Sequence, residues 1–266
     1  MRSSARGSGE RPKSRTTSRY TVGGLSIADI VIVTVLTFVG STLQGAIGFG
    51  MGLLAAPLLI LLDPRFVPAP ILVCTLVLTL LMAYRERHAI DVGGIKWALL
   101  GRIAGTAVAG WILAIVAADT LVLLFGLFIL AAVAMSASGL RFEPTGRALV
   151  TAGVLSGVLG TVAAVGGPPL ALLYQDASGA RIRSTISGFF VIGTIVSLAA
   201  LWVVGRFGAG ELRLALVMLP GMLAGLALSR RIAPFVDRGH TRPAVLAVVA
   251  LTGVAIVVRE VARESW

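Results

Sequence analysis

The chain has 266 residues, of which 57% are hydrophobic and only 13% are charged, and its mean hydropathy is +0.95. Soluble globular domains carry about 25% charged residues, so this composition excludes a soluble domain and a disordered chain and leaves a polytopic membrane protein. The net charge of +11 would suggest a nucleic-acid partner in a soluble protein, but here its meaning depends on where the basic residues lie. The single cysteine, Cys74, excludes an internal disulfide and a cysteine-cluster metal site.

Stretches without charged residues define the expected helices. Crossing a bilayer core of about 30 Å takes about 20 apolar residues, and backbone groups in lipid must be satisfied internally, so apolar segments predict helices. We therefore predict an all-α polytopic membrane protein. Its eight or so hydrophobic segments are Ile30–Leu62, Phe66–Tyr84, Ile95–Ala118, Thr120–Leu140, Ala148–Gln175, Ser184–Gly205, Leu214–Ser229 and Ala244–Val258.

Two of these segments are interrupted. Ile30–Leu62 is too long for one crossing, and glycines crowd its middle ahead of Pro57. Ala148–Gln175 has a similar glycine run ahead of Pro168 and Pro169. Glycine disfavours a helix interior and proline removes a donor, so each segment should divide into two half-helices or bend into a re-entrant hairpin. Such backbone persists at membrane depth only when it is buried in protein or lines a wet cavity.

The two interrupted segments correspond to one another in sequence. A shift of 112 residues pairs Gly45 with Gly157, Gly48 with Gly160, Pro57 with Pro169 and Leu58 with Leu170. A shift of 120 residues pairs Gly101 and Gly105 with Gly221 and Gly225. We predict two homologous four-segment halves, residues 25–140 and 141–266, after a basic, disordered cytoplasmic tail of residues 1–24. Interrupted segments at matching places in two halves are typical of a transporter binding site.

The basic residues outside the segments bear on orientation. If each interrupted segment crosses once, Lys and Arg divide 15 to 7 in favour of the side that holds both termini, which the positive-inside rule places in the cytoplasm. If both segments are hairpins, the division is 11 to 11. We expect a multi-pass protein of the bacterial inner (plasma) membrane with a cytoplasmic N-terminus. The sense of the repeats stays open: parallel for single crossings, inverted for hairpins.

Polar groups at membrane depth suggest an anion site. Arg102 is the only charged residue well inside a segment, and it could pair with an anionic substrate or extend toward the membrane interface. A half-helix that begins in mid-membrane presents free N–H groups and the positive end of its dipole, as would the stretches after Gly52 and from Pro168. Gln44 precedes the first break and can donate to an oxyanion. The alternative role for the glycines is small-residue packing between helices.

Enzyme motifs are missing from the sequence. It has no P-loop, no G-x-G-x-x-G fingerprint and no G-x-S-x-G nucleophile elbow. No Asp or Glu lies in a segment core and both histidines fall in loops, which leaves few metal ligands and no carboxylate proton relay. We therefore expect no catalytic residue, no metal and no cofactor.

Residues 45–59 read GAIGFGMGLLAAPLL and residues 157–170 read GVLGTVAAVGGPPL. This pair resembles the duplicated glycine-rich signature of the TauE/SafE family of sulfite exporters, and the resemblance extends over nearly the whole chain. It implies a secondary carrier of sulfite, of sulfonates such as sulfoacetate, or of related sulfur oxyanions. The signature points to Gly48, Gly50, Gly52, Pro57, Gly160, Gly166, Gly167 and Pro169 in this chain. The chemistry of the residues themselves adds Gln44, Arg102, Thr161 and Pro168 to the predicted substrate site.

The sequence thus predicts a secondary transporter that exports a small sulfur-containing anion through a site between the two interrupted segments. The alternatives are an anion channel, a carrier of another small organic anion such as a carboxylate, and, less favoured, an intramembrane enzyme. The expected partners are the small anion and membrane lipid, without nucleic acid, and a homo-oligomer is compatible with the sequence.

Overall fold

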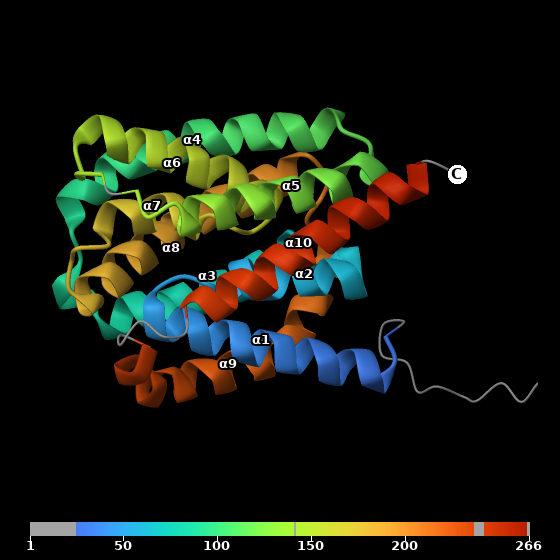
Figure 1. The fold of residues 1–266 in the computed structure, drawn as a ribbon, viewed down its shortest axis with the longest axis horizontal. Coiled ribbons are helices and arrows are strands. Elements are labelled where there is room, and N and C mark those ends of the chain that lie inside the picture. The colour runs from blue at the N-terminus through green and yellow to red at the C-terminus, as the bar shows by residue number, and fades with distance from the viewer. Residues whose placement is uncertain (1–24, 141, 237–241, 265–266) are drawn as a thin grey trace, which may run out of the picture.

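A computed structural model describes residues 25–140, 142–236 and 242–264, so the predicted tail of residues 1–24 lies outside the described part. Within these ranges the chain is helical and has no strand, which confirms the predicted all-α class. The described α-helices are α1 (Ile27–Ile47), α2 (Met51–Leu62), α3 (Ala69–Arg85), α4 (Val92–Ile115), α5 (Ala118–Ala137), α6 (Gly146–Val162), α7 (Gly167–Tyr174), α8 (Gly179–Val203), α9 (Ala209–Val236) and α10 (Arg242–Glu264) (Figure 1).

Six helical runs of the described residues are long and apolar enough to cross a membrane. They are α1, Pro64–Arg85 (which includes α3), α4, Thr120–Ala137 in α5, α8 and Ala209–Ala233 in α9. The apolar helices α2 and α6 are shorter. Each of the eight predicted segments is helical, and each of the two interrupted segments consists of two helices, α1–α2 and α6–α7.

The first interrupted segment is a re-entrant hairpin. Gly48 ends α1 with a φ of 105°, in the left-handed region that favours glycine. The Met51 N–H at the start of α2 donates to Gln44 Oε1 at 3.0 Å. Gly40 faces Met51 and Ala55, which places α2 back alongside α1 (Figure 1). The left-handed turn therefore reverses the chain between α1 and α2.

The second interrupted segment repeats this construction with different residues. Ala164 follows α6 with a φ of 59°, and Ser156 Oγ donates to Gly166 O at 2.6 Å across the hairpin. The N-cap residues of α2 and α7 are Gly50 and Gly166, which are 116 residues apart.

This spacing corrects the 112-residue shift taken from the sequence. That shift pairs Pro57, in the middle of α2, with Pro169, in the first turn of α7. Its error is four residues, close to one helical turn. The slipped register pairs two glycines, whereas the 116-residue register pairs only Gly50 with Gly166, so matching glycines favours the wrong register.

Glycines also let helices of opposite halves approach closely. A methyl group on Gly101 or Gly105 of α4 would collide with the α6 backbone, and one on Gly221 or Gly225 of α9 would collide with the α1 backbone. In each pair, the second glycine contacts a residue further along the partner helix than the first glycine does. The helices of each pair, α4 with α6 and α9 with α1, are therefore parallel. The first helix of each predicted half thus packs on the fourth helix of the other.

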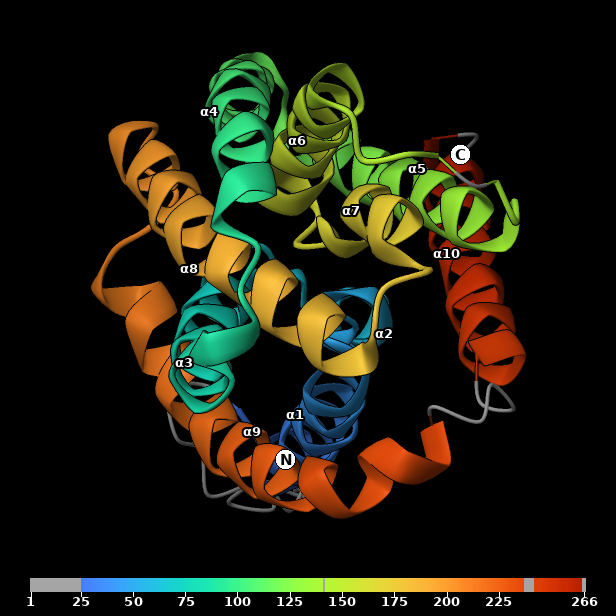
Figure 2. The same ribbon diagram turned by 90° about the vertical axis from the view of Figure 1, so that its left-hand side faces the viewer.

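The two short half-helices lie inside the bundle. Figure 2 shows α2 and α7 between the α5–α10 pair and the α3–α8 pair. Because both interrupted segments turn back, α1 and α6 run in opposite directions (Figure 1), which is the inverted sense of the two left open by the sequence. In this topology the basic residues outside the helix cores divide 11 to 11, so their number does not set the orientation.

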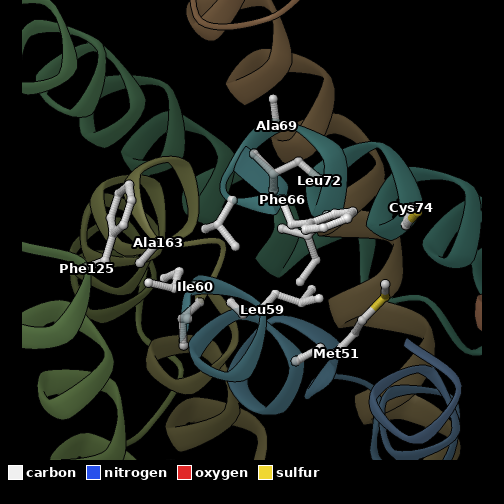
Figure 3. Packing of buried hydrophobic residues seen from close by; sticks show 14 of the residues in the cluster. Met51, Leu59, Ile60, Phe66, Ala69, Leu72, Cys74, Phe125 and Ala163 are labelled. Atoms are coloured by element: carbon white, nitrogen blue, oxygen red, sulfur yellow. The ribbon is translucent and has the colours of Figure 1, made fainter. Parts of the chain in front are cut away.

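An apolar core holds α2 at this depth. Met51 and Leu59 of α2 are fully buried, as is Phe66 just before α3, and Leu72 of α3 and Phe125 of α5 pack in the same cluster (Figure 3). Among membrane helices such side chains stabilise through van der Waals packing rather than through removal from water. The core therefore fixes the half-helix whose N-terminus points at the candidate site.

Candidate functional site

A small cavity of about 20 Å³ lies where the two hairpins meet. The turn of each hairpin contacts the first turn of the other's half-helix. A methyl group on Gly52 of α2 would overlap Ala164 O, and one on Gly167 of α7 would lie 2.7 Å from Phe49 Cβ. Glycine at these two positions therefore lets the hairpins close around the cavity.

Both half-helices present their N-termini to this cavity. Gly50, the N-cap of α2, and Gly166, the N-cap of α7, line it, and neither provides a capping side chain. The first backbone N–H groups of a helix have no partner within the helix and carry partial positive charge. Two such ends at one cavity create a positive potential there.

Arg102 of α4 is 1% exposed in spite of its charge. Its Nη1 donates to Ser156 O and, at 2.9 Å, to Ser156 Oγ, while its Nη2 donates to Ser197 Oγ at 2.8 Å. The rings of Phe189 and Phe190 are centred 5.7 and 6.0 Å from the guanidinium carbon. The guanidinium thus points into the protein, and the extension toward the interface considered from the sequence is wrong.

Three glycines make room for this guanidinium. A methyl group on Gly160, Gly166 or Gly193 would lie 2.5, 2.8 or 2.9 Å from Arg102 nitrogens, Nη1 for the first two and Nε for the third. Gly160 therefore accommodates the arginine. Gly157 instead packs against the α4 backbone, as the alternative role in helix packing predicts for it.

The charge of Arg102 has no carboxylate among its hydrogen-bond partners in the described residues, and no carboxylate lines the cavity. Three buried polar atoms of the lining lack a hydrogen-bond partner within the described part of the chain: Arg102 Nε, Gln44 Nε2 and Thr194 Oγ1. An uncompensated buried charge and unsatisfied buried donors are both unfavourable. Their convergence on one cavity indicates a place for an anion.

The structure brings most of the predicted site residues together. Those that line the cavity are Gln44, Gly50, Gly52, Arg102, Gly160, Gly166, Gly167 and Pro168. Four others lie outside the lining: Gly48 in the α1–α2 turn, Pro57 in the middle of α2, Thr161 beside Arg102 in a hydrogen bond with Ser197, and Pro169 in the first turn of α7. These four support the hairpins or the guanidinium from behind the cavity wall.

Sequence reasoning missed two threonines of the lining, Thr75 and Thr194. Threonine in a membrane helix commonly bonds to its own backbone, and Thr75 does so, donating to Ile71 O at 2.8 Å. Thr194 does not. The available signal was a row of hydroxyls on α8, since residues 184, 187, 194 and 197 recur at helical spacing and are all fully buried.

A second, wider pocket of about 180 Å³ adjoins the first, because Phe49, Gly50 and Leu53 line both. Its lining is mostly apolar but includes Arg183 near the start of α8. Arg183 Nε pairs with Glu86 at 3.2 Å and its Nη1 donates to Ala46 O at 3.4 Å. The wider pocket therefore lies between the small cavity and the start of α8, where it includes a basic residue in its lining.

At the same end, Asp91 fixes the start of the helix that carries Arg102. Its carboxylate accepts the Gly94 N–H at 3.2 Å as the N-cap of α4 and pairs with Arg181 at 3.3 Å. The backbone hydrogen bond first, and the arginine second, hold the pKa of Asp91 below its usual 3.8.

This arrangement defines a multi-pass membrane transporter, with broken segments that converge on a buried site. The family model described as sulfite exporter TauE/SafE matches residues 33–256, and the chain belongs to that family, as the glycine-rich signature suggested. Its members are membrane transporters of sulfur anions. The comparisons with curated proteins and with solved structures gave no match.

Proposed function

We propose that the protein is a secondary transporter that carries a small sulfur-containing anion, sulfite or an organosulfonate such as sulfoacetate, out of the cell. The observation that carries this proposal is Arg102, a fully buried guanidinium without a carboxylate partner in the described residues, at a cavity between two helix N-termini. An anion in the cavity would supply the missing counter-charge. Family membership supports a sulfur anion over other small anions.

In this proposal the anion is bound by Arg102 Nε, Gln44 Nε2 and Thr194 Oγ1, the three buried donors without partners in the described part of the chain. The positive ends of the α2 and α7 helix dipoles add to the positive potential, although Pro168 and Pro169 leave the first turn of α7 with fewer N–H groups. The glycines of both hairpins let the anion approach the backbone closely, which a Cβ would prevent. The wider pocket would give access from one end of the bundle.

Export follows from the electrostatics. A membrane potential that is negative inside favours anion exit by about 2.3 kcal/mol per charge per 100 mV. Uptake against that potential would need a coupled cation. The cavity lining contains no carboxylate that could bind such a cation or relay its proton.

We further propose two inverted repeats, residues 25–140 and 141–266, in the bacterial inner membrane with the N-terminus in the cytoplasm. The matched pairing of α1 with α9 and of α6 with α4 supports the repeats. The total of basic residues is equal on the two sides, so the orientation rests on the six that precede the first helix, whose flanking charges usually dominate. In intact cells a membrane-impermeant thiol reagent should label a Glu143→Cys variant and spare a Gly208→Cys variant. The opposite labelling pattern would refute this orientation.

Transport itself can be tested with purified full-length protein in liposomes. We expect saturable exchange of labelled sulfite or sulfoacetate that empty liposomes lack. Flux that rises without saturation would show a channel instead. Equal competition by acetate would point to a general carboxylate carrier, and chemical conversion of the substrate, followed by mass spectrometry, would reveal an enzyme. Any of these three results contradicts the proposal.

A further inference from the structure

The polar side chains that line the small cavity are few. They are Gln44, Thr75, Arg102 and Thr194, from α1, α3, α4 and α8. No carboxylate and no histidine belongs to this lining. The hydrogen-bonding character of the cavity is therefore set by one guanidinium, one carboxamide and two hydroxyls.

Most of these groups are hydrogen-bond donors. Gln44 Oε1 accepts the Met51 N–H at 3.0 Å, so its amide is oriented and its Nε2 remains as an unpartnered donor. Arg102 uses Nη1 and Nη2 on protein oxygens and keeps Nε unpartnered. Guanidinium and amide nitrogens cannot accept a hydrogen bond. The side-chain acceptors in the lining are all neutral: the oxygens of the two threonines and Gln44 Oε1, which already accepts the Met51 N–H.

The threonines differ in what they can offer. Thr75 gives its hydrogen to Ile71 O, while Thr194 Oγ1 is buried without a partner among the described residues. A ligand oxygen without hydrogen can accept from Thr194, Gln44 and Arg102 together. A ligand hydroxyl turned toward either nitrogen would set donor against donor and leave a buried N–H unsatisfied.

Resting on the proposed function, in which this cavity binds the transported anion, we propose a rule of selectivity. The cavity selects oxyanions that carry no hydrogen, such as the sulfite dianion, sulfate and sulfonates, and rejects anions of equal size and charge that carry a hydroxyl. Hydrogenphosphate is the most abundant anion of the second kind. A site built to hydrogen-bond one pattern of donors and acceptors rejects an analogue that leaves its buried groups unpaired.

Gln44 determines this preference in a testable way. A Gln44→Glu variant keeps one oxygen for the Met51 N–H and replaces the unpartnered Nε2 with a second oxygen of nearly the same shape. That oxygen is an acceptor that a ligand hydroxyl could use. The variant should therefore shift the preference toward hydrogen-bearing anions. Its added negative charge should also lower the affinity for every anion.

The experiment is calorimetric titration of the purified full-length protein in detergent at alkaline pH, above the second pKa of phosphate, with four separate probes. Sulfate and methanesulfonate carry no hydrogen on oxygen. Fluorophosphate and hydrogenphosphate form the matched pair, since both are dianions and fluorine replaces one hydroxyl. We expect fluorophosphate to bind about as tightly as sulfate, and hydrogenphosphate to bind about tenfold more weakly or worse.

In the Gln44→Glu variant, the ratio of hydrogenphosphate to fluorophosphate affinity should rise about tenfold. The control is Gln175→Glu, which adds the same charge in the wider pocket and should leave that ratio unchanged. Equal binding of the matched pair by the wild-type protein overturns the selectivity rule while leaving the anion site in place. Failure of all four probes to bind overturns the proposed site itself.

Discussion

The two hairpins have the same backbone plan but different chemistry. Each ends its first helix with a left-handed residue, Gly48 or Ala164, and begins its half-helix after a glycine N-cap. A side chain joins the two arms in each, Gln44 in the first and Ser156 in the second. Each hairpin also packs on a long helix of the other predicted half.

The two hairpins differ in the side chain that the neighbouring long helix places beside them. In α4, Arg102 lies between Gly101 and Gly105, and in α9 Met222 occupies the matching place between Gly221 and Gly225. Met222 is fully buried. The cavity thus takes its charge from one half alone, with its carboxamide coming from α1 and its hydroxyl from α8. A near-symmetric scaffold holds an asymmetric site, which suits one anion at a time.

The largest expected effect on anion affinity comes from replacing Arg102 of α4 with the methionine found at the matching place of α9. An Arg102→Met variant should bind sulfite or sulfate about 100-fold more weakly, because removing one partner of a buried charge pair costs about 2–5 kcal/mol. The unliganded variant should melt at no lower temperature, since Ser156 Oγ still donates to Gly166 O and Ser197 Oγ still donates to Gly193 O. Removing an unpaired buried charge also relieves its desolvation penalty.

Calorimetric titration and thermal melting in detergent would measure both effects. The control is Met222→Leu at the matching place of α9, for which we expect unchanged anion affinity. An Arg102→Met variant that retains wild-type affinity would show that the guanidinium is structural.

The sequence predicted the scaffold well because its signals are physical and local. Long apolar stretches with few charged residues predicted the positions of the helices, and runs of glycine followed by proline predicted both interruptions. Reversal of the chain at Gly48 and Ala164 was not predictable, because an apolar segment with a central break fits both a crossing and a hairpin. The left-handed residue that decides between them is a glycine in one case and an ordinary alanine in the other.

The site was predictable where residue type is unusual for its depth, as for Arg102 and Gln44. Thr194 and Gly193 were not, since threonine and glycine are ordinary residues in an unbroken membrane helix. Their role depends on α8 lying against α4, so that Gly193 meets the Arg102 side chain. Such a contact is a property of packing between helices that lie far apart in sequence.

The contact between the hairpins provides the second comparison. A Gly52→Ala methyl would overlap the backbone oxygen of Ala164, which has no flexible end that could move away. We expect a loss of about 1–3 kcal/mol in the free energy of unfolding, as for other overpacked cores, together with weaker anion binding because the hairpins are forced apart at the cavity.

The matched control is Gly110→Ala in α4, where the new methyl would lie 3.8 Å from the Ala200 methyl, an ordinary contact. This variant should gain up to about 1 kcal/mol from helix propensity. Thermal melting of both variants in detergent would measure this difference in stability. Equal melting temperatures would mean that the hairpin turns do not touch as described.

The smallest expected effect concerns the turns themselves. Ala164 adopts a left-handed φ of 59°, which costs an L-residue about 1–2 kcal/mol. An Ala164→Gly variant relieves that strain but loses about 0.4–1 kcal/mol through the greater freedom of the unfolded chain, so a net stabilisation of about 0.5 kcal/mol is expected. The converse variant, Gly48→Ala, should destabilise, because its φ is 105° and the methyl would lie 2.9 Å from Arg183 Cα. Opposite shifts in the melting temperatures of the two variants would show that the two hairpins share one backbone plan. If Ala164→Gly lowers the melting temperature instead, the packing of the alanine methyl stabilises the protein more than its backbone strain destabilises it.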